Sequence, residues 1–120
     1  MPLRALRGAI TVERNDAESI LEATEELVRE LMRANGLGPG DLVSCIFTCT
    51  PDLNAEFPAV AARNVGLSAV PLLCAQEIDV PGALPRVIRV MAHCDTDGGV
   101  ANHVYLREAR DLRRDLEGAQ

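Results

Sequence analysis

Apolar residues recur at helical spacing between positions 16 and 35, and this pattern predicts one long amphipathic helix. Asn15 and Asp16 offer side-chain oxygens for the helix N-terminus, and Glu18 follows Asn15 at the spacing of a capping box. Gly36 supplies a C-terminal stop. At 3.6 residues per turn the apolar positions lie on one face; they are Ile20, Leu21, Leu27, Val28, Leu31 and Met32.

Five other segments have the composition of strands, with apolar and β-branched residues bounded by turn residues. A shorter helix is predicted over 55–64, beginning near Pro58 and closed by Gly66. The segment 81–85 is predicted to be a turn with room for a single helical turn. The predicted strands cover residues 3–14, 42–50, 68–76, 86–96 and 103–106.

The resulting element order, β-α-β-α-β-β-β, predicts an α+β fold. We expect a mixed five-stranded sheet with one long and one short helix packed on one side. The second face and the edges of such a sheet need cover. Because the chain contains so little helix, we expect oligomerisation to supply that cover.

Two arginines interrupt apolar strand segments. Arg7 lies within the run 5–10 and Arg89 lies within the run 87–91. A guanidinium is always charged, and burying it without a partner is very costly. Each arginine therefore needs an anion, which is either an internal carboxylate or a bound ligand. From the two runs alone the internal ion pair is favoured, because buried charges are normally paired.

The charge balance narrows the kind of ligand and partner. The chain has 120 residues and a formal net charge of −6, which fits one soluble domain over residues 1–120. Nucleic acid is not an expected partner, because it needs a basic surface. The aromatic residues Phe47, Phe57 and Tyr105 are also too few for base stacking. An anionic ligand would have to be held by a local cluster of cations.

Cysteine usage and hydropathy predict a cytoplasmic protein without a metal. The sequence shows neither a signal-peptide pattern nor a long apolar span, so no membrane contact is expected. In the cytoplasm thiols stay reduced. Sulfurs on Cys45 and Cys49 would lie too far apart along a strand to share a zinc ion. The cysteines expected to be free, small apolar residues are Cys45, Cys49, Cys74 and Cys94.

Five segments, in this order and at this spacing, carry a resemblance to one known family. They are residues 4–13, 50–59, 70–82, 88–91 and 103–106. Together they resemble the monofunctional, trimeric barrel-type chorismate mutases, over about residues 4–116. The resemblance implies a pseudo α/β-barrel homotrimer with sites between neighbouring subunits. It also implies a C-terminal tail, from about residue 107, that is either ordered or mobile.

The resemblance implies the Claisen rearrangement of chorismate to prephenate. This reaction is a unimolecular bond shift that needs no nucleophile, general base, metal or cofactor. The enzyme holds the substrate in its reactive conformer and stabilises the charge that grows on the ether oxygen. Two other functions are kept open for a similar trimeric barrel: a non-catalytic module that binds a small dicarboxylate, and an imine deaminase.

Three charged residues match the catalytic positions of the family. Arg89 matches the cation that donates to the breaking ether oxygen, and its alternative role is a structural ion pair. Arg7 matches a residue that contacts a substrate carboxylate, for which the guanidinium fork is suited. Its alternative is pairing with Glu77 or another acid. Glu77 matches the carboxylate that accepts the substrate ring hydroxyl, and its alternative is a solvated charge at a strand end.

Other residues match substrate-binding positions. Cys74 matches a residue near the ring hydroxyl, and Tyr105 matches a residue whose hydroxyl reaches a carboxylate. Phe57 matches an apolar wall and Arg63 a rim cation. The alternative for Cys74 is a packed thiol, and for Tyr105 it is a core aromatic whose hydroxyl reaches water. The alternative for Phe57 is plain core packing, and for Arg63 it is a solvated helix face.

The resemblance extends into the C-terminal tail, and three positions of the chain depart from the family pattern. Leu112 and Arg113 match a segment that folds over the site. The tail arginines are Arg107, Arg110, Arg113 and Arg114. On a helix they would line one basic face. For Arg107 and Arg110 we expect this face to be solvated. Relatives often carry Lys at the position of Val60, a small polar residue at that of Leu73, and Pro at that of Arg114.

Overall fold

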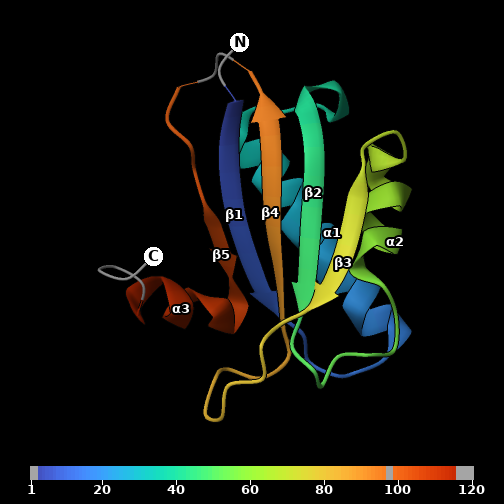
Figure 1. Ribbon diagram of the computed structural model, residues 1–120, viewed down its shortest axis with the longest axis vertical. Coiled ribbons are helices and arrows are strands. Elements are labelled where there is room, and N and C mark those ends of the chain that lie inside the picture. Colours follow the sequence, from blue (N-terminus) through green and yellow to red (C-terminus); the bar gives the residue numbers. More distant parts are fainter. Residues whose placement is uncertain (1–2, 97–98, 116–120) are drawn as a thin grey trace.

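A mixed five-stranded sheet forms the centre of this computed structural model, which describes residues 3–96 and 99–115, with side chains to residue 112. The strand order is β3-β2-β4-β1-β5 (Figure 1). β4 pairs antiparallel with β1 and β2, whereas β1 with β5 and β2 with β3 are parallel pairs. The predicted α+β class is confirmed. The strands are β1 (Leu3–Thr11), β2 (Leu42–Cys49), β3 (Leu72–Gln76), β4 (Val87–Asp95) and β5 (Val104–Leu106).

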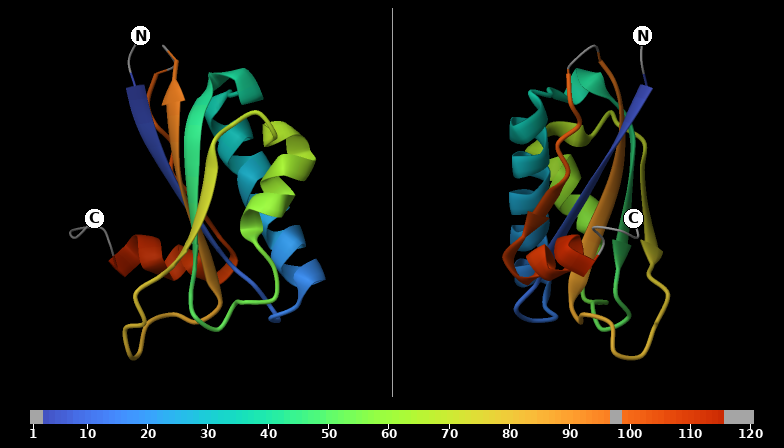
Figure 2. Two further views of the ribbon diagram at one scale, coloured as in Figure 1. Left: turned by 45° about the vertical axis from the view of Figure 1, so that its right-hand side comes forward. Right: turned by 90° about the vertical axis from the view of Figure 1, so that its left-hand side faces the viewer.

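Helices α1 (Ala17–Asn35) and α2 (Pro58–Ala62) cover one face of this sheet (Figure 2). Side chains alternate between the faces of a strand, so every second strand residue meets the helices. Removing these apolar surfaces from water is the main stabilising contribution to the fold. The largest fully buried side chains of this core include Phe47, Leu6, Ile10, Ile20, Leu27, Leu67 and Ile88.

The N-terminus of α1 differs from its predicted form. Asp16 is the N-cap, and its Oδ1 accepts a hydrogen bond of 2.7 Å from the backbone N–H of Ser19. The capping box predicted at Asn15 is therefore wrong. The side-chain Oδ1 of Asn15 instead accepts hydrogen bonds from the backbone N–H groups of Asn54 and Ala55 at 3.0 and 3.1 Å. Asn15 thus ties the start of α1 to the segment before α2.

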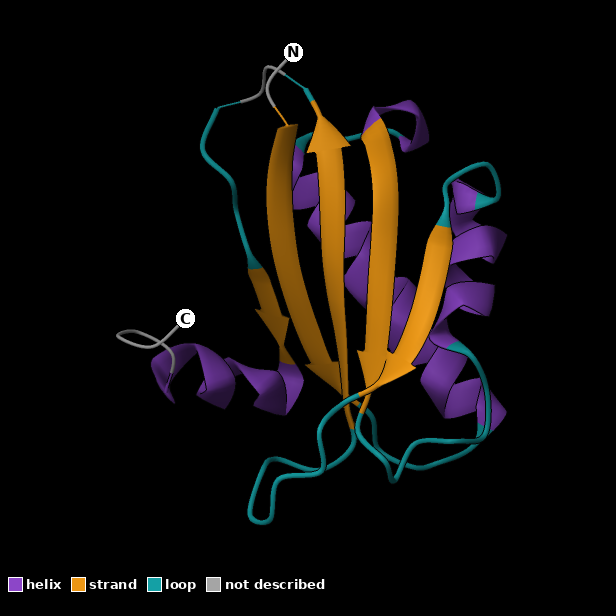
Figure 3. Ribbon diagram, in the orientation of Figure 1, coloured by secondary structure: helices purple, strands orange, loops and turns teal. Residues whose placement is uncertain are grey.

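Several elements are shorter than predicted. β1 ends at Thr11, and β3 begins at Leu72 because residues 68–70 form a turn. Helix α2 begins at Pro58, as expected, and continues into a π-helical turn (Arg63–Leu67). Gly66 has φ of 109° there, which a residue with a side chain rarely adopts. Residues 77–86 form the long loop between β3 and β4 without a helical turn (Figure 3).

The sheet face opposite α1 and α2 is largely open over the described residues. Leu3, Ile46 and Leu73 lie on this face and are 64%, 37% and 60% exposed. At one corner a 3₁₀ turn (Arg107–Ala109) and helix α3 (Arg110–Asp115) follow β5. A small apolar cluster forms there from Ala9, Val87 and Ala109, with Leu84, Tyr105 and Leu112 packed against it. The described residues include no helix with both the length and the apolar character needed to cross a membrane.

Candidate functional site

Strand register brings Arg7 and Arg89 together on the open face of the sheet. Ala9 pairs with Arg89 and Arg7 pairs with Met91 across the antiparallel β1–β4 ladder. The two arginines are therefore diagonal neighbours that point away from the helices. They line a cavity of about 430 Å³, here called the sheet-face cleft. Its lining residues are Arg7, Gly8, Ala9, Ile46, Thr48, Glu77, Arg89, Val90, Met91 and Tyr105.

Glu77 is the acid of the sheet-face cleft. Its backbone N–H donates to the Cys49 carbonyl at 2.8 Å, which fixes the chain beside the end of β2. One carboxylate oxygen, Oε2, accepts a hydrogen bond of 2.7 Å from the Thr48 hydroxyl. The same oxygen lies 3.3 Å from Nε of Arg89. The internal ion pair that the sequence left open for Arg89 is therefore present.

This ion pair does not satisfy the Arg89 guanidinium. The Nε atom of Arg89 is buried, yet it has no hydrogen-bond partner in the part of the chain described. Its 3.3 Å separation from Glu77 permits charge attraction without an aligned hydrogen bond. Buried donors without an acceptor are rare and call for an explanation. A ligand oxygen in the cleft would supply the acceptor.

The local charge of the cleft differs in sign from that of the whole chain. Arg7 and Arg89 face one carboxylate, Glu77, so the cleft carries an excess of one positive charge within a chain of net charge −6. In an acidic chain, an anionic ligand needs such a local cluster of cations. Ile46 and Met91 give the cleft apolar walls. It can therefore hold a small molecule that combines carboxylates with an apolar ring.

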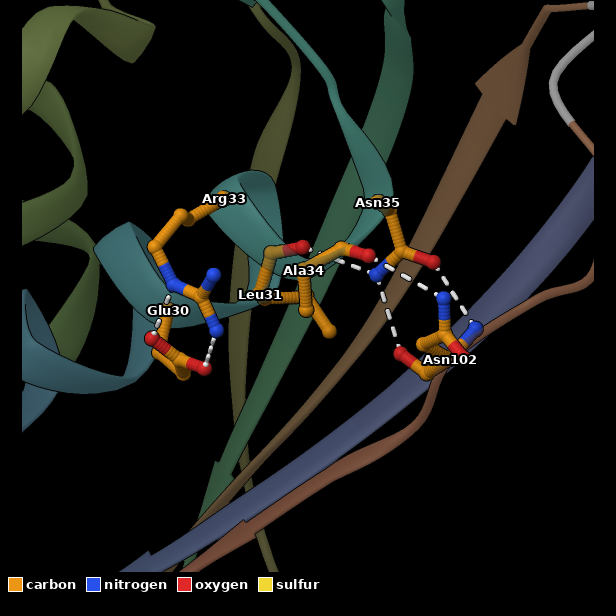
Figure 4. A network of polar contacts seen from close by, with 6 residues as sticks. All are labelled: Glu30, Leu31, Arg33, Ala34, Asn35 and Asn102. Carbon is orange, nitrogen blue, oxygen red and sulfur yellow. Dashed lines mark hydrogen bonds and ion pairs between the residues drawn. The ribbon is translucent and has the colours of Figure 1, made fainter.

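Tyr105 reaches the cleft because β5 is held beside β1. The side-chain amide of Asn35, at the end of α1, donates to the Asn102 carbonyl and accepts the Asn102 N–H, at 2.9 and 2.8 Å (Figure 4). This pair fastens the segment that leads into β5. The N–H of Arg7 donates to Nδ1 of His103 at 3.0 Å. Helix α1 thus helps to place Tyr105, which lies next to Ala9 in the sheet.

The tail leaves the sheet through Arg107, which has a φ of 54°. Its guanidinium donates to the Thr11 carbonyl at 3.2 Å and pairs with Glu26 at 2.7 Å. Arg107 therefore does not lie on a basic helix face, and that prediction is wrong, whereas Arg110 is exposed as expected. Leu112 packs in the cluster that contains Tyr105, beside the cleft. The side chains of Arg113 and Arg114 lie outside the described residues.

Phe57 and Cys74 do not join the sheet-face cleft. They line a second cavity, of about 360 Å³, here called the edge cleft. Phe57 is 67% exposed, which excludes plain core packing. Cys74 lies on the helix-facing side and packs against the main core. Arg63 is exposed at the end of α2 and lines neither cleft. The two clefts have no lining residue in common.

Two of the three departures from the family pattern, Val60 and Leu73, fall outside the sheet-face cleft, and the third, Arg114, has its side chain outside the described residues. Val60 is half-buried in α2, and Leu73 is exposed on β3. Neither contributes to the lining around Arg89.

The described cysteines are free thiols, as predicted. Burial raises the pKa of Cys45 and of Cys49 to about 11. Both therefore stay protonated near neutral pH and are poor nucleophiles. Over residues 3–96 and 99–115, no group of three or more His, Cys, Asp or Glu side chains is placed to hold a metal ion.

Sequence reasoning missed six residues of the sheet-face cleft, which are Gly8, Ala9, Ile46, Thr48, Val90 and Met91. Strand alternation would place Ile46 and Thr48 on one face of β2 and Met91 with Arg89 on one face of β4. It does not say that these faces coincide, because that depends on the β2–β4 register. In the sequence Thr48 is a single hydroxyl between the apolar residues Phe47 and Cys49, which is too weak a signal to mark a site.

Comparisons with known proteins agree with this geometry. The family described as chorismate mutase type I matches residues 3–116. The chain is 53% identical to the chorismate mutase AroH of Thermus thermophilus over 121 aligned positions, which cover 98% of this chain and 99% of that protein. It is 44% identical to chorismate mutase AroH of Bacillus subtilis (strain 168), with coverages of 97% and 94%. A solved chorismate mutase structure from Clostridium thermocellum matches with a TM-score of 0.89 at 49% identity, over 91% of this chain and 99% of that one.

Proposed function

The chain belongs to the type I chorismate mutase family, and from this membership we infer that it is an isomerase that converts chorismate to prephenate. We place this activity in the sheet-face cleft, because Arg7, Glu77, Arg89 and Tyr105 meet there. These are the residue types that a ring dicarboxylate with a hydroxyl and an ether oxygen requires.

We propose that Arg89 acts on charge that exists only while the ether bond breaks. The rearrangement is unimolecular, so the protein contributes positioning and electrostatic stabilisation. The buried Nε–H of Arg89 lacks an acceptor among the described residues, and the ether oxygen would become that acceptor as its negative charge grows. A donor fixed in a partly buried cleft is screened less than one in water. Arg89 would therefore stabilise the transition state more than the substrate.

The other residues of the cleft would orient the substrate. Arg7 would bind a carboxylate with its guanidinium fork. Glu77 would accept the ring hydroxyl, and the Tyr105 hydroxyl would reach a carboxylate. Leu112, packed beside Tyr105, and Arg113 would fold over the bound substrate and exclude water. No cofactor takes part in this scheme.

We further propose that the complete site is formed between two copies of the chain. Phe57 and Cys74 line the edge cleft, and Arg63 lies exposed at the other end of the helix that Phe57 precedes. The open sheet face carries exposed apolar residues, including Ile46 and Leu73, which favour burial against a partner. A homotrimer of the pseudo-barrel type would bring the edge cleft of one subunit against the sheet-face cleft of the next.

The remaining assignments follow from the same reasoning. We propose a single domain over residues 1–120 in the cytoplasm, without a nucleic-acid or membrane partner. The net charge of −6 supports the exclusion of nucleic acid.

The test is to add chorismate to the purified protein and follow the loss of its conjugated-diene absorbance, with prephenate identified as the product. We expect a rate far above that in buffer, with saturation by substrate. A rate equal to that in buffer would reject the isomerase function. Saturable binding without turnover would instead support a dicarboxylate-binding module.

A further inference from the structure

Thr48 contacts the acid of the sheet-face cleft. It lies on β2 directly opposite Arg89 on β4 in the antiparallel ladder. Its hydroxyl donates to Glu77 Oε2 at 2.7 Å, which is a short, charge-assisted hydrogen bond. The Thr48 side chain itself lines the cleft. Three side chains from three neighbouring segments, Thr48, Glu77 and Arg89, thus meet at one carboxylate oxygen.

The observed orientation of Glu77 is not the one that a lone carboxylate beside an arginine prefers. Arginine and carboxylate groups tend to form two parallel hydrogen bonds. Here the Glu77–Arg89 contact is a single approach of 3.3 Å, and Nε of Arg89 makes no hydrogen bond to the described residues. Rotation about the terminal bond of a glutamate is soft, so only a small change separates the two arrangements.

The Thr48 hydroxyl accounts for this difference. It donates to Oε2, the oxygen nearest to Nε of Arg89. This oxygen has a second lone pair, but to align it with Nε of Arg89 the carboxylate would have to turn, which would bend or lengthen the 2.7 Å bond. The half-buried hydroxyl of Thr48 would then be poorly satisfied, which is unfavourable.

We propose that Thr48 is a positioning residue that holds the Glu77 carboxylate away from a closed ion pair with Arg89. It thereby keeps the Arg89 Nε–H available for the ligand. The part of this inference that concerns catalysis rests on the function proposed above, in which Arg89 and Glu77 both contact the substrate. The part that concerns the substrate-free protein does not.

Kinetics of Thr48→Val test the catalytic part, because valine keeps the shape of threonine and removes the hydroxyl. In this variant the closed ion pair forms before substrate arrives, and substrate must break it. An apparent affinity falls in proportion to the fraction of protein that is competent to bind. We expect kcat/KM to fall about tenfold or more, mainly through a raised KM. Thr48→Ala should behave in the same way.

Two further variants separate positioning from stability. Thr48→Ser keeps the hydroxyl and should stay within about twofold of the wild type. Thr24→Val is the matched control, because the buried hydroxyl of Thr24 also donates a bond of 2.7 Å, to the Ile20 carbonyl within α1. It should change the unfolding midpoint and leave KM unaltered. An unchanged KM in both Thr48→Val and Thr48→Ala, or an equal loss in Thr48→Ser, would overturn the proposal.

A second readout is independent of turnover. The Nε–H group of Arg89 can be followed by ¹H–¹⁵N NMR of the substrate-free protein, with its signal assigned by its loss in Arg89→Lys. We expect this proton signal to move downfield in Thr48→Val, as Nε gains a carboxylate acceptor, and to stay in place in Thr48→Ser. An unmoved signal in Thr48→Val would refute the proposal even if chorismate is converted. If chorismate is not converted by the wild type, the proposed function fails, whereas this readout still decides the role of Thr48.

Discussion

The two arginines on the open sheet face differ in their surroundings. Arg89 is paired at 3.3 Å with Glu77 and still has a buried donor without an acceptor in the described chain. Arg7 lies one strand away, and its backbone N–H is held by His103. These surroundings support a transition-state role for Arg89 and a positioning role for Arg7.

Replacing Arg89 by lysine should lower kcat by at least about two orders of magnitude, as removal of an oxyanion donor does. An ammonium group is compact and cannot reproduce the planar fork of a guanidinium. Steady-state kinetics with chorismate would measure the effect, and KM should change far less than kcat. The matched control is Arg29→Lys on the outer face of α1, where Arg29 pairs with Glu25 at 2.9 Å. A normal kcat in Arg89→Lys would make Arg89 a structural residue.

The sequence drew attention to Arg7 and Arg89 because charge inside an apolar strand is costly. It did not reveal Thr48, since a single hydroxyl in a strand has many harmless explanations. It also grouped Phe57, Arg63 and Cys74 with the arginines through family resemblance alone. In one copy of the chain these residues lie apart from the sheet-face cleft.

Among the elements, α1 was the most predictable. Its apolar spacing is a local property, and the structure buries that face as expected. Its N-cap was not predictable in detail, because Asn15 and Asp16 are both good caps. Contacts of Asn15 with Asn54 and Ala55, far along the chain, decided between them.

The Asp16 cap should make helix stability depend on pH. The Ser19 N–H holds the pKa of Asp16 below its usual 3.8, with a smaller contribution from Arg14. A carboxylate with a lowered pKa stabilises the fold above its unfolded pKa and loses that effect as the pH falls through the folded value. Asp16→Ala should therefore lower the unfolding midpoint at pH 7, with a smaller difference from wild type at a pH below 3.

Urea unfolding at both pH values would measure this effect. Asp16→Asn is the control, because asparagine caps helices well without a charge. Equal stability of wild type and Asp16→Ala at pH 7 would show that the cap contributes nothing. A difference that persists unchanged at low pH would show that the charge of Asp16 does not contribute.

Strand existence was predictable, but strand pairing was not. The order β3-β2-β4-β1-β5 places the fourth strand at the centre. A register shift between Leu42 and Ser44 further adjusts β2 against β4. Since a shift by one residue would turn Arg89 toward the helices, the cleft depends on this non-local register.

The whole molecule has one covered and one open sheet face. Helices α1 and α2 lie on the first (Figure 2), and the second carries the sheet-face cleft beside exposed Ile46 and Leu73. An edge cleft with an exposed Phe57 lies elsewhere on the same chain. If the copies meet head to tail in a closed ring, each interface joins one cleft of each kind.

Mixing two inactive variants would show whether catalysis needs both clefts. Arg89→Lys damages the sheet-face cleft. Phe57→Asp places a carboxylate in the edge cleft, where it would repel a dicarboxylate substrate. After each variant is shown to keep the mass of the wild-type oligomer, equal amounts would be unfolded together, refolded and assayed with chorismate. We expect about one quarter of wild-type activity, because that share of random interfaces joins two intact clefts. Activity no higher than the average of the separately refolded variants would contradict a site shared between two copies.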